Sequence, residues 1–189
     1  MATQVITEGK MKGRKMSMSA PTVVEHGHMR FLITDQPDER QMRSYIDMLK
    51  QNHVAHVARA CEPTYKEADL APIRVHEFQF DDGTPPPTEV LKRWLDLCES
   101  CFINKLSPDY LSDGERIAVH CVAGLGRAPV LVVIALIEDG MEPLEAVQFM
   151  RSKRKGVLNT AQLHWVSQYV RTRDKKWHRF ENPKSCVIM

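Results

Sequence analysis

The sequence has no long apolar run and few cysteines. Its longest apolar stretch, Pro129–Ile137, is much shorter than the roughly 20 residues that a membrane-spanning helix needs. The N-terminus lacks the hydrophobic stretch of a signal peptide. The five cysteines are irregularly spaced and do not form the pattern of a disulfide framework. We therefore expect a protein that is made in the cytosol and whose cysteines are free thiols.

Net charge is low, at +2, but it is unevenly distributed. Residues 1–20 carry a net charge of +3 and residues 171–184 carry +4, which leaves −5 for the rest of the chain. Basic ends around an acidic body favour an electrostatic role for the two ends and argue against a nucleic-acid-binding domain. For the N-terminal residues, a simple solvated terminus without a partner is the default interpretation. We expect a flexible basic arm over residues 1–20, one folded domain over 21–174 and a basic tail over 175–189.

Hydrophobic patterning predicts an α/β fold with a mainly parallel central sheet and helices on both of its faces. The stretches that favour strands are Thr22–Glu25, Met29–Thr34, Val54–Arg59, Ile73–Phe78 and Arg116–His120. The stretches that favour helices are Asp38–Gln51, Thr88–Leu106, Arg127–Glu138, Glu142–Lys153 and Ala161–Asp174. In such folds the binding crevice lies at the carboxyl ends of the strands.

The stretch HCVAGLGRAP, residues 120–129, follows the last predicted strand. Gly124 and Gly126 permit positive φ and close backbone approach, so successive N–H groups can turn toward one point. A helix that begins at Arg127 directs its positive end to the same point, and the guanidinium can bind phosphate oxygens in a bidentate pair. This setting favours the thiolate of Cys121, a nucleophile toward phosphorus. A buried cysteine in a glycine turn is the alternative.

Phosphoryl transfer to a cysteine also needs an acid that protonates the leaving oxygen. The stretch FDDGTPPP, residues 80–87, places Asp81 and Asp82 on a loop that follows a predicted strand. An ordinary surface turn is the alternative interpretation of this composition.

The stretches FDDG, AVHCVAGLGRAPVLV and EAVQF and the terminal CVIM resemble the phosphatases of regenerating liver, which are small prenylated dual-specificity protein tyrosine phosphatases. The similarity extends from about residue 29 to the C-terminus. It implies a single-domain cysteine-phosphatase fold over residues 21–174 that uses no metal or other cofactor. The loop over residues 104–116 is longer than the family pattern.

The resemblance also implies roles for individual residues. Cys121 would be the nucleophile, Arg127 the phosphate-binding side chain and Asp82 the general acid, with Asp81 as the alternative acid. Cys61 matches a cysteine that forms a redox disulfide with Cys121. Ala128 stands where most cysteine phosphatases have a serine or threonine that assists hydrolysis of the intermediate. The phosphoryl oxygens would be bound by the amides of Val122, Ala123, Gly124, Leu125 and Gly126.

Two functions are consistent with the resemblance. The first is hydrolysis of a phosphorylated protein or phosphoinositide. The second is a binding module for cyclin M magnesium transport mediators, in which catalysis is secondary. The sequence does not identify the substrate, and it leaves open whether the chain forms a homo-oligomer.

The last four residues, Cys186 to Met189, have the form of a C-a-a-X prenylation signal with terminal Met, which favours farnesylation of Cys186. Basic residues precede it and add attraction to an anionic membrane of about 1 kcal/mol each. We expect the protein at the cytoplasmic face of the plasma membrane and endomembranes, and in the cytosol or nucleus when it is unprenylated.

Two other features have more than one interpretation. Cys98 and Cys101 form a Cys-x-x-Cys inside a predicted helix, where core or helix-surface thiols are expected in preference to a metal site. His120 either tunes the active-site thiol through a hydrogen bond or simply ends a buried strand.

Overall fold

The computed structural model describes residues 18–173, and these form one five-stranded sheet with the strand order β1-β2-β5-β3-β4. The strands are β1 (Thr22–His26), β2 (Met29–Asp35), β3 (Val54–Arg59), β4 (Arg74–Glu77) and β5 (Arg116–Cys121). Strand β1 pairs antiparallel with β2, and all other neighbours pair in parallel. The predicted mainly parallel sheet is confirmed.

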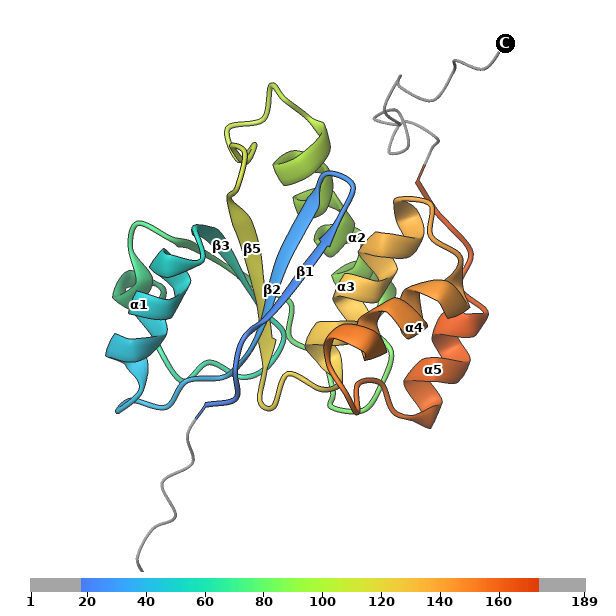
Figure 1. Cartoon of the computed structure of the whole chain (residues 1–189), viewed down its shortest axis with the longest axis horizontal. Coiled ribbons are helices and arrows are strands. Elements are labelled where there is room, and N and C mark those ends of the chain that lie inside the picture. The colour runs from blue at the N-terminus through green and yellow to red at the C-terminus, as the bar shows by residue number, and fades with distance from the viewer. Residues whose placement is uncertain (1–17, 174–189) are drawn as a thin grey trace, which may run out of the picture.

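Helices cover both faces of the sheet, as predicted for an α/β fold. Figure 1 shows α1 on one face and the group α2 to α5 on the other. The helical elements are α1 (Met42–Gln51), the 3-10 turn η1 (Glu67–Leu70), α2 (Thr88–Cys98), the π-helical turn η2 (Glu99–Ile103), α3 (Arg127–Glu138), α4 (Pro143–Lys153) and α5 (Thr160–Ser167). In the described part of the chain, no helix has the length and apolarity needed to cross a membrane.

The larger core lies between the sheet and α2 to α5. Helix α3 is its centre, since every residue of this helix is buried. The indole Nε1 of Trp94 on α2 donates to the carbonyl of Leu131 on α3 at 2.7 Å, which joins the two helices through a satisfied buried donor. A smaller core on the opposite face packs Tyr45 and Leu49 of α1 against the sheet. Strand β5 is thus covered on both sides, which explains why all of its residues after Arg116 are buried.

The first predicted helix begins later than the sequence suggested. Asp38 and Gln41 bond each other's backbone N–H groups with their side chains, at 2.9 Å in both directions. The reciprocal pair has the form of a capping box, and residues 39–41 form a tight turn in which the Gln41 amide also donates to the carbonyl of Asp38 at 3.0 Å, so the regular helix α1 starts at Met42.

Two other predicted helices end earlier. The stretch Thr88–Leu106 is regular only to Cys98 and then widens into η2, where the amide of Asn104 donates to the carbonyl of Glu99 at 2.8 Å. The stretch predicted over 161–174 is helical over Thr160–Ser167. Buried Glu138 on α3 accepts the backbone N–H groups of Thr172 and Arg173 at 2.8 and 3.0 Å, which draws this segment out of the helix.

Four of the five strands differ from their predicted bounds by one residue at one or both ends, and β1 and β2 each continue one residue further, to His26 and Asp35. The stretch predicted over 73–78 is paired only at Arg74–Glu77, and β5 continues one residue past the predicted end, to Cys121. Cys121 is paired with Asp35 of β2. The sheet therefore fixes the backbone of Cys121 directly.

Candidate active site

The loop of residues 122–126 connects β5 to α3, at the carboxyl end of the sheet, where the sequence predicted the binding crevice. Three of its carbonyls are bonded to groups outside the loop. Val122 O accepts from the Gln36 amide at 3.1 Å, and Leu125 O accepts from the Leu158 amide at 2.9 Å. Ala123 O accepts from the side chain of Arg154 at 3.1 Å.

These outward carbonyls determine where the loop amides point. In a planar trans peptide the N–H is opposite the C=O, so the amides of Ala123, Gly124 and Gly126 point away from those partners. The N-terminus of α3 adds further N–H groups without intrahelical partners at the same place. The arrangement can bind the oxygens of a phosphoryl group.

Gly124 and Gly126 serve different purposes. Gly124 has φ +63, and a Cβ there would lie 2.8 Å from the carbonyl oxygen of Thr34 and 2.9 Å from Arg154 Nη2. Both the left-handed backbone and the close approach require glycine at this position. Gly126 has φ −116, so the expectation of a positive φ holds for only one of the two glycines. A Cβ at Gly126 would lie 3.6 Å from the carboxylate of Asp82 and 3.5 Å from the amide of Gln162.

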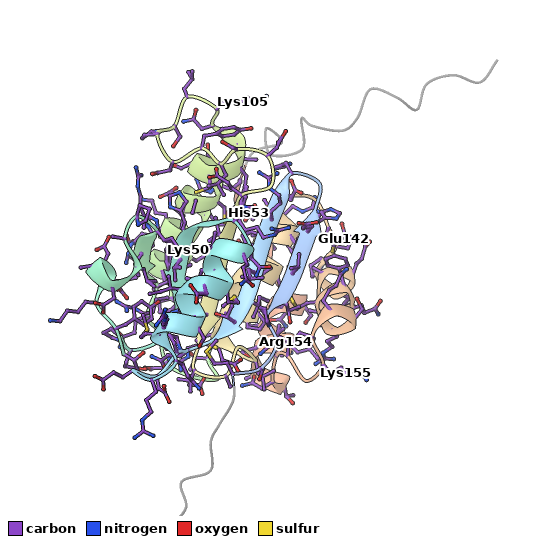
Figure 2. The ribbon with its side chains drawn as sticks, turned by 60° about the vertical axis from the view of Figure 1, so that its left-hand side comes forward. Lys50, His53, Lys105, Glu142, Arg154 and Lys155 are labelled. Atoms are coloured by element: carbon purple, nitrogen blue, oxygen red, sulfur yellow. The ribbon has the colours of Figure 1, made fainter. Side chains whose placement is uncertain are left out.

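Arg154 supports the loop from the side of β2. Its guanidinium binds Asp35 Oδ1 at 2.7 Å and also donates to the carbonyls of Ala20 and Ala123. Figure 2 shows Arg154 at the end of the molecule opposite Lys105 and His53, and this is the end where the loop after β5 lies in Figure 1. Arg154 thus connects the first described residues to the loop.

Cys121 is 3% exposed and ends β5 beside this loop. Arg127, the first residue of α3, is also buried, and its Nη1 donates to the carbonyl of Phe80 at 3.3 Å. Its Nε makes no hydrogen bond within the described residues, although it lies 3.3 Å from Asp82 Oδ1. A buried guanidinium N–H without a hydrogen bond is available to an anion. Cys121 and Arg127 thus lie at the two ends of loop 122–126, one on β5 and the other on α3.

The two neighbouring carboxylates are not equivalent. The carboxylate of Asp82 lies 3.3 Å from Nε of Arg127, and its side chain is 76% exposed. Asp81 is exposed, and its carbonyl accepts the Thr84 hydroxyl at 2.9 Å within the turn. The geometry favours Asp82 over Asp81 as the group that faces a phosphoryl oxygen.

Cys61 lies at the same carboxyl edge of the sheet as Cys121, as parallel strand order predicted, because it follows β3, which pairs in parallel with β5. It is buried, and burial raises the pKa of its thiol to about 12, with the nearby Cys121 adding to the rise. The sulfur lies 3.9 Å from His120 Nδ1, while His120 Nε2 lies 2.6 Å from the Tyr65 hydroxyl. Burial lowers the pKa of His120 to about 3, so its ring is neutral. His120 therefore contacts the thiol of Cys61 inside the sheet.

Cys98 and Cys101 are buried free thiols in α2 and η2, as expected. Burial raises the pKa of both. Within residues 18–173, no group of three or more His, Cys, Asp or Glu side chains is arranged to hold a metal ion. The predicted lipidation site Cys186 and the tail over 175–189 lie outside the described residues.

The sequence interpretation missed four side chains around the site: Glu62, Arg154, Asn159 and Gln162. Glu62 Oε2 lies 3.6 Å from Arg127 Nη1. Glu62 could have been found from the sequence, because it directly follows Cys61 and is a carboxylate at the carboxyl end of a predicted strand. The other three come from the segment between α4 and α5 and from the start of α5, and no local motif marked them.

The comparisons with known proteins agree with this geometry. A protein-tyrosine phosphatase family model matches residues 79–171. The chain is 42% identical to mouse protein tyrosine phosphatase type IVA 3 over 181 residues, which is 93% of this chain and 99% of the relative. It is 40% identical to rat protein tyrosine phosphatase type IVA 2 over 174 residues, or 91% of this chain and 99% of the relative.

A solved structure of a protein tyrosine phosphatase from Leishmania major superimposes with a TM-score of 0.72 at 37% identity, covering 81% of this chain and all of that one. The predicted family and fold are confirmed. The chain belongs to the protein tyrosine phosphatase type IVA family, the phosphatases of regenerating liver, and is a cysteine-dependent protein tyrosine phosphatase.

Proposed function

We propose that the chain hydrolyses phosphomonoesters through a phosphocysteine on Cys121. The observation that carries the proposal is that Cys121, at the end of β5, and Arg127, at the start of α3, flank loop 122–126, and that the buried Nε of Arg127 makes no hydrogen bond within the described residues. The Cys121 thiolate attacks phosphorus, and the bond from phosphorus to the ester oxygen breaks. Arg127 and the loop amides bind the charge on the phosphoryl oxygens during transfer.

Asp82 supplies the proton that the leaving oxygen needs. In the second step a water molecule attacks the phosphocysteine, gives its proton to the Asp82 carboxylate and returns Cys121 to the thiolate. Phosphorylated proteins and phosphoinositides both carry the dianionic group that this site accommodates, so either class is a candidate substrate.

The leaving group separates the role of Asp82 from that of its neighbour. We expect Asp82→Asn to lower kcat/KM about 100-fold for phosphotyrosine, whose phenolate needs a proton. The loss should be small for 2,4-dinitrophenyl phosphate, whose phenolate leaves unprotonated. Asp81→Asn is the matched control and should leave both values nearly unchanged. Equal losses on the two substrates in Asp82→Asn, or a larger loss in Asp81→Asn, would assign the proton to another group.

A redox disulfide between Cys61 and Cys121 is the second part of the proposal. Peroxide oxidises the Cys121 thiolate to a sulfenic acid. The Cys61 thiol then displaces its hydroxyl, forming the disulfide and releasing water. The raised pKa of Cys61 supports this division of roles, because a protonated buried thiol reacts slowly with peroxide itself.

Cys61→Ser should convert reversible inactivation into permanent inactivation. After mild peroxide, wild-type activity should return with a thiol reductant, and peptide mapping should find the link from Cys61 to Cys121. Cys61→Ser should not recover, because its sulfenic acid proceeds to higher oxidation states. Cys101→Ser, which alters another buried cysteine, should recover like the wild type. Full recovery of Cys61→Ser, with no such link in the wild type, would rule the disulfide out.

We further propose that prenylation of Cys186, together with the basic residues before it, places the enzyme at the cytoplasmic face of membranes. Cys186→Ser should move the protein from the membrane fraction to the cytosol and nucleus, measured by fractionation and by fluorescence imaging. Cys61→Ser serves as the cysteine control and should remain on membranes. Unchanged membrane association of Cys186→Ser would refute the anchor.

Binding to cyclin M magnesium transport mediators is the second candidate function, and it would use the surface formed by loop 122–126. The observation that favours a protein partner is the exposure of two apolar side chains on the loop, Val122 at 54% and Leu125 at 41%. A partner that covers them should bind Cys121→Ser as tightly as the wild type. It should bind Leu125→Glu much more weakly, as pull-down with a purified cyclin M domain would measure. Equal binding of Leu125→Glu would remove this support.

A further inference from the structure

One short segment contacts two loops of the site. These are the phosphate-binding loop, residues 122–126, and the acid loop, residues 80–87, which carries Asp82. The amide of Leu158, in the connection from α4 to α5, donates to Leu125 O of the phosphate-binding loop at 2.9 Å. The side-chain amide of Asn159 donates from Nδ2 to the carbonyl of Gly83 at 2.9 Å. The side-chain amide of Gln162, in the first turn of α5, donates from Nε2 to the carbonyl of Thr84 at 3.2 Å. Figure 1 shows this connection at the same end of the molecule as the loop after β5.

The two amide side chains are themselves fixed in place. Asn159 caps α5 by accepting the Gln162 amide on Oδ1 at 2.8 Å, and Gln162 Oε1 accepts the Asn159 amide at 3.2 Å. Because both oxygens accept these N–H groups, the orientation of each side-chain amide is determined, and both NH2 groups must face the acid loop. Gln162 is fully buried. Arg151 binds the carbonyls of Val157 and Leu158, both at 3.3 Å, which supports the segment from α4.

The two carbonyls that accept these bonds directly follow the proposed acid. Gly83 and Thr84 are the first and second residues after Asp82. Gly83 has φ +75, and a Cβ there would lie 3.1 Å from Asn159 Nδ2, so the close approach is made over a glycine. The Asp82 side chain is 76% exposed, so packing around it does little to fix it. Its backbone is held from the C-terminal side by the two bonds.

We propose that Asn159 and Gln162 are positioning residues that hold the acid loop closed over the phosphate-binding loop. They act on the reaction through Asp82 and touch no reacting atom, and the inference rests on the proposed role of Asp82 as general acid. Both loops are tied to one rigid segment. The distance between the Asp82 carboxylate and the phosphoryl group is therefore set by the start of α5.

Asn159→Ser tests this role with little change to the helix. Serine is a good N-cap, so the cap of α5 is kept, but its side chain has no NH2 group to reach Gly83 O. We expect kcat/KM for phosphotyrosine to fall about fivefold to tenfold, the effect of one lost hydrogen bond, while kcat/KM for 2,4-dinitrophenyl phosphate stays within about twofold of wild type. The melting temperature should stay close to that of the wild type. Asn159→Asp, which also caps, is the second variant if the serine variant does not fold.

A double-mutant cycle with Asp82 completes the test. In an Asp82→Asn background, Asn159→Ser should cause no further loss, because the group that it positions is gone. Equal losses on both substrates, or losses that add to those of Asp82→Asn, would overturn the positioning role. If Asp82→Asn itself lost the same activity on phosphotyrosine as on 2,4-dinitrophenyl phosphate, the proposed role of Asp82 as general acid would be wrong. If Asp82→Asn showed the leaving-group dependence and Asn159→Ser did not, only this inference would fail.

Discussion

Cys121→Ser is expected to lower kcat by about 10⁴-fold or more, the scale observed when an enzyme loses its nucleophile. A serine hydroxyl is hardly ionised at neutral pH, so it is a much weaker nucleophile toward phosphorus than the cysteine thiolate. His120, the preceding residue, has its ring directed to Cys61 and Tyr65. Arg127 and the loop amides remain, so the variant should still bind phosphorylated substrates.

Steady-state hydrolysis of phosphotyrosine measures this loss, and retention of a phosphopeptide on immobilised Cys121→Ser measures the binding that remains. Cys98→Ser is the matched control, since it changes a buried cysteine of α2 and should leave the rate nearly unchanged. Turnover by Cys121→Ser within tenfold of the wild type would contradict the proposed nucleophile.

Arg127→Lys is expected to lower kcat/KM by about 10³-fold, even though it keeps the positive charge. The guanidinium is a planar fork with several donors, while the ammonium of lysine is a single point charge. In this site one donor is used on Phe80 O and another faces Asp82, so the loss includes both the phosphate contacts and the alignment of the acid loop. The loss of a single preorganised donor costs about 10²- to 10³-fold in comparable sites.

The control for Arg127→Lys lies at the other end of the sheet. Arg116 begins β5, the strand that ends at Cys121, and pairs with Glu25. Arg116→Lys should leave kcat/KM within about twofold, because its contacts are far from the reacting atoms. If Arg127→Lys kept most of the activity, or if the two variants lost equal amounts, the phosphate-binding role of Arg127 would be wrong.

The sequence predicted the parts of this molecule that depend on neighbouring residues. The turn from Cys121 to Arg127 combines strand, glycine, helix start and charge within seven positions, so its function follows from local chemistry. The placement of Cys61 also followed, because parallel strands end at one edge of a sheet. Helix ends were less predictable. The boundary at Cys98 depends on a π-helical turn, and the end at Ser167 depends on Glu138, which lies on another helix.

The side chains that hold the loops of the site in place could not be predicted, because they come from segments that are distant in sequence. Arg154 reaches the carbonyl of Ala123 from the end of α4, and Asn159 reaches Gly83 from the start of α5. In a sequence, Asn159 is an ordinary N-cap, and the donor that it presents to the acid loop is a property of the fold. The residues that do the chemistry are therefore local to their motifs, while those that position them are not.

During turnover the phosphoryl group is expected to be transferred to Cys121 before it reaches water. Ala128 has no hydroxyl to assist thiolate departure, so breakdown of the intermediate should be slow and the intermediate should accumulate. The most direct measurement is rapid acid quenching during turnover of a phosphotyrosine substrate, followed by peptide mapping of the enzyme. We expect phosphate on Cys121 at nearly one per enzyme, formed before inorganic phosphate is released. Phosphate on a different residue, or a first turnover that releases inorganic phosphate together with the phenol and leaves no phosphopeptide, would contradict it.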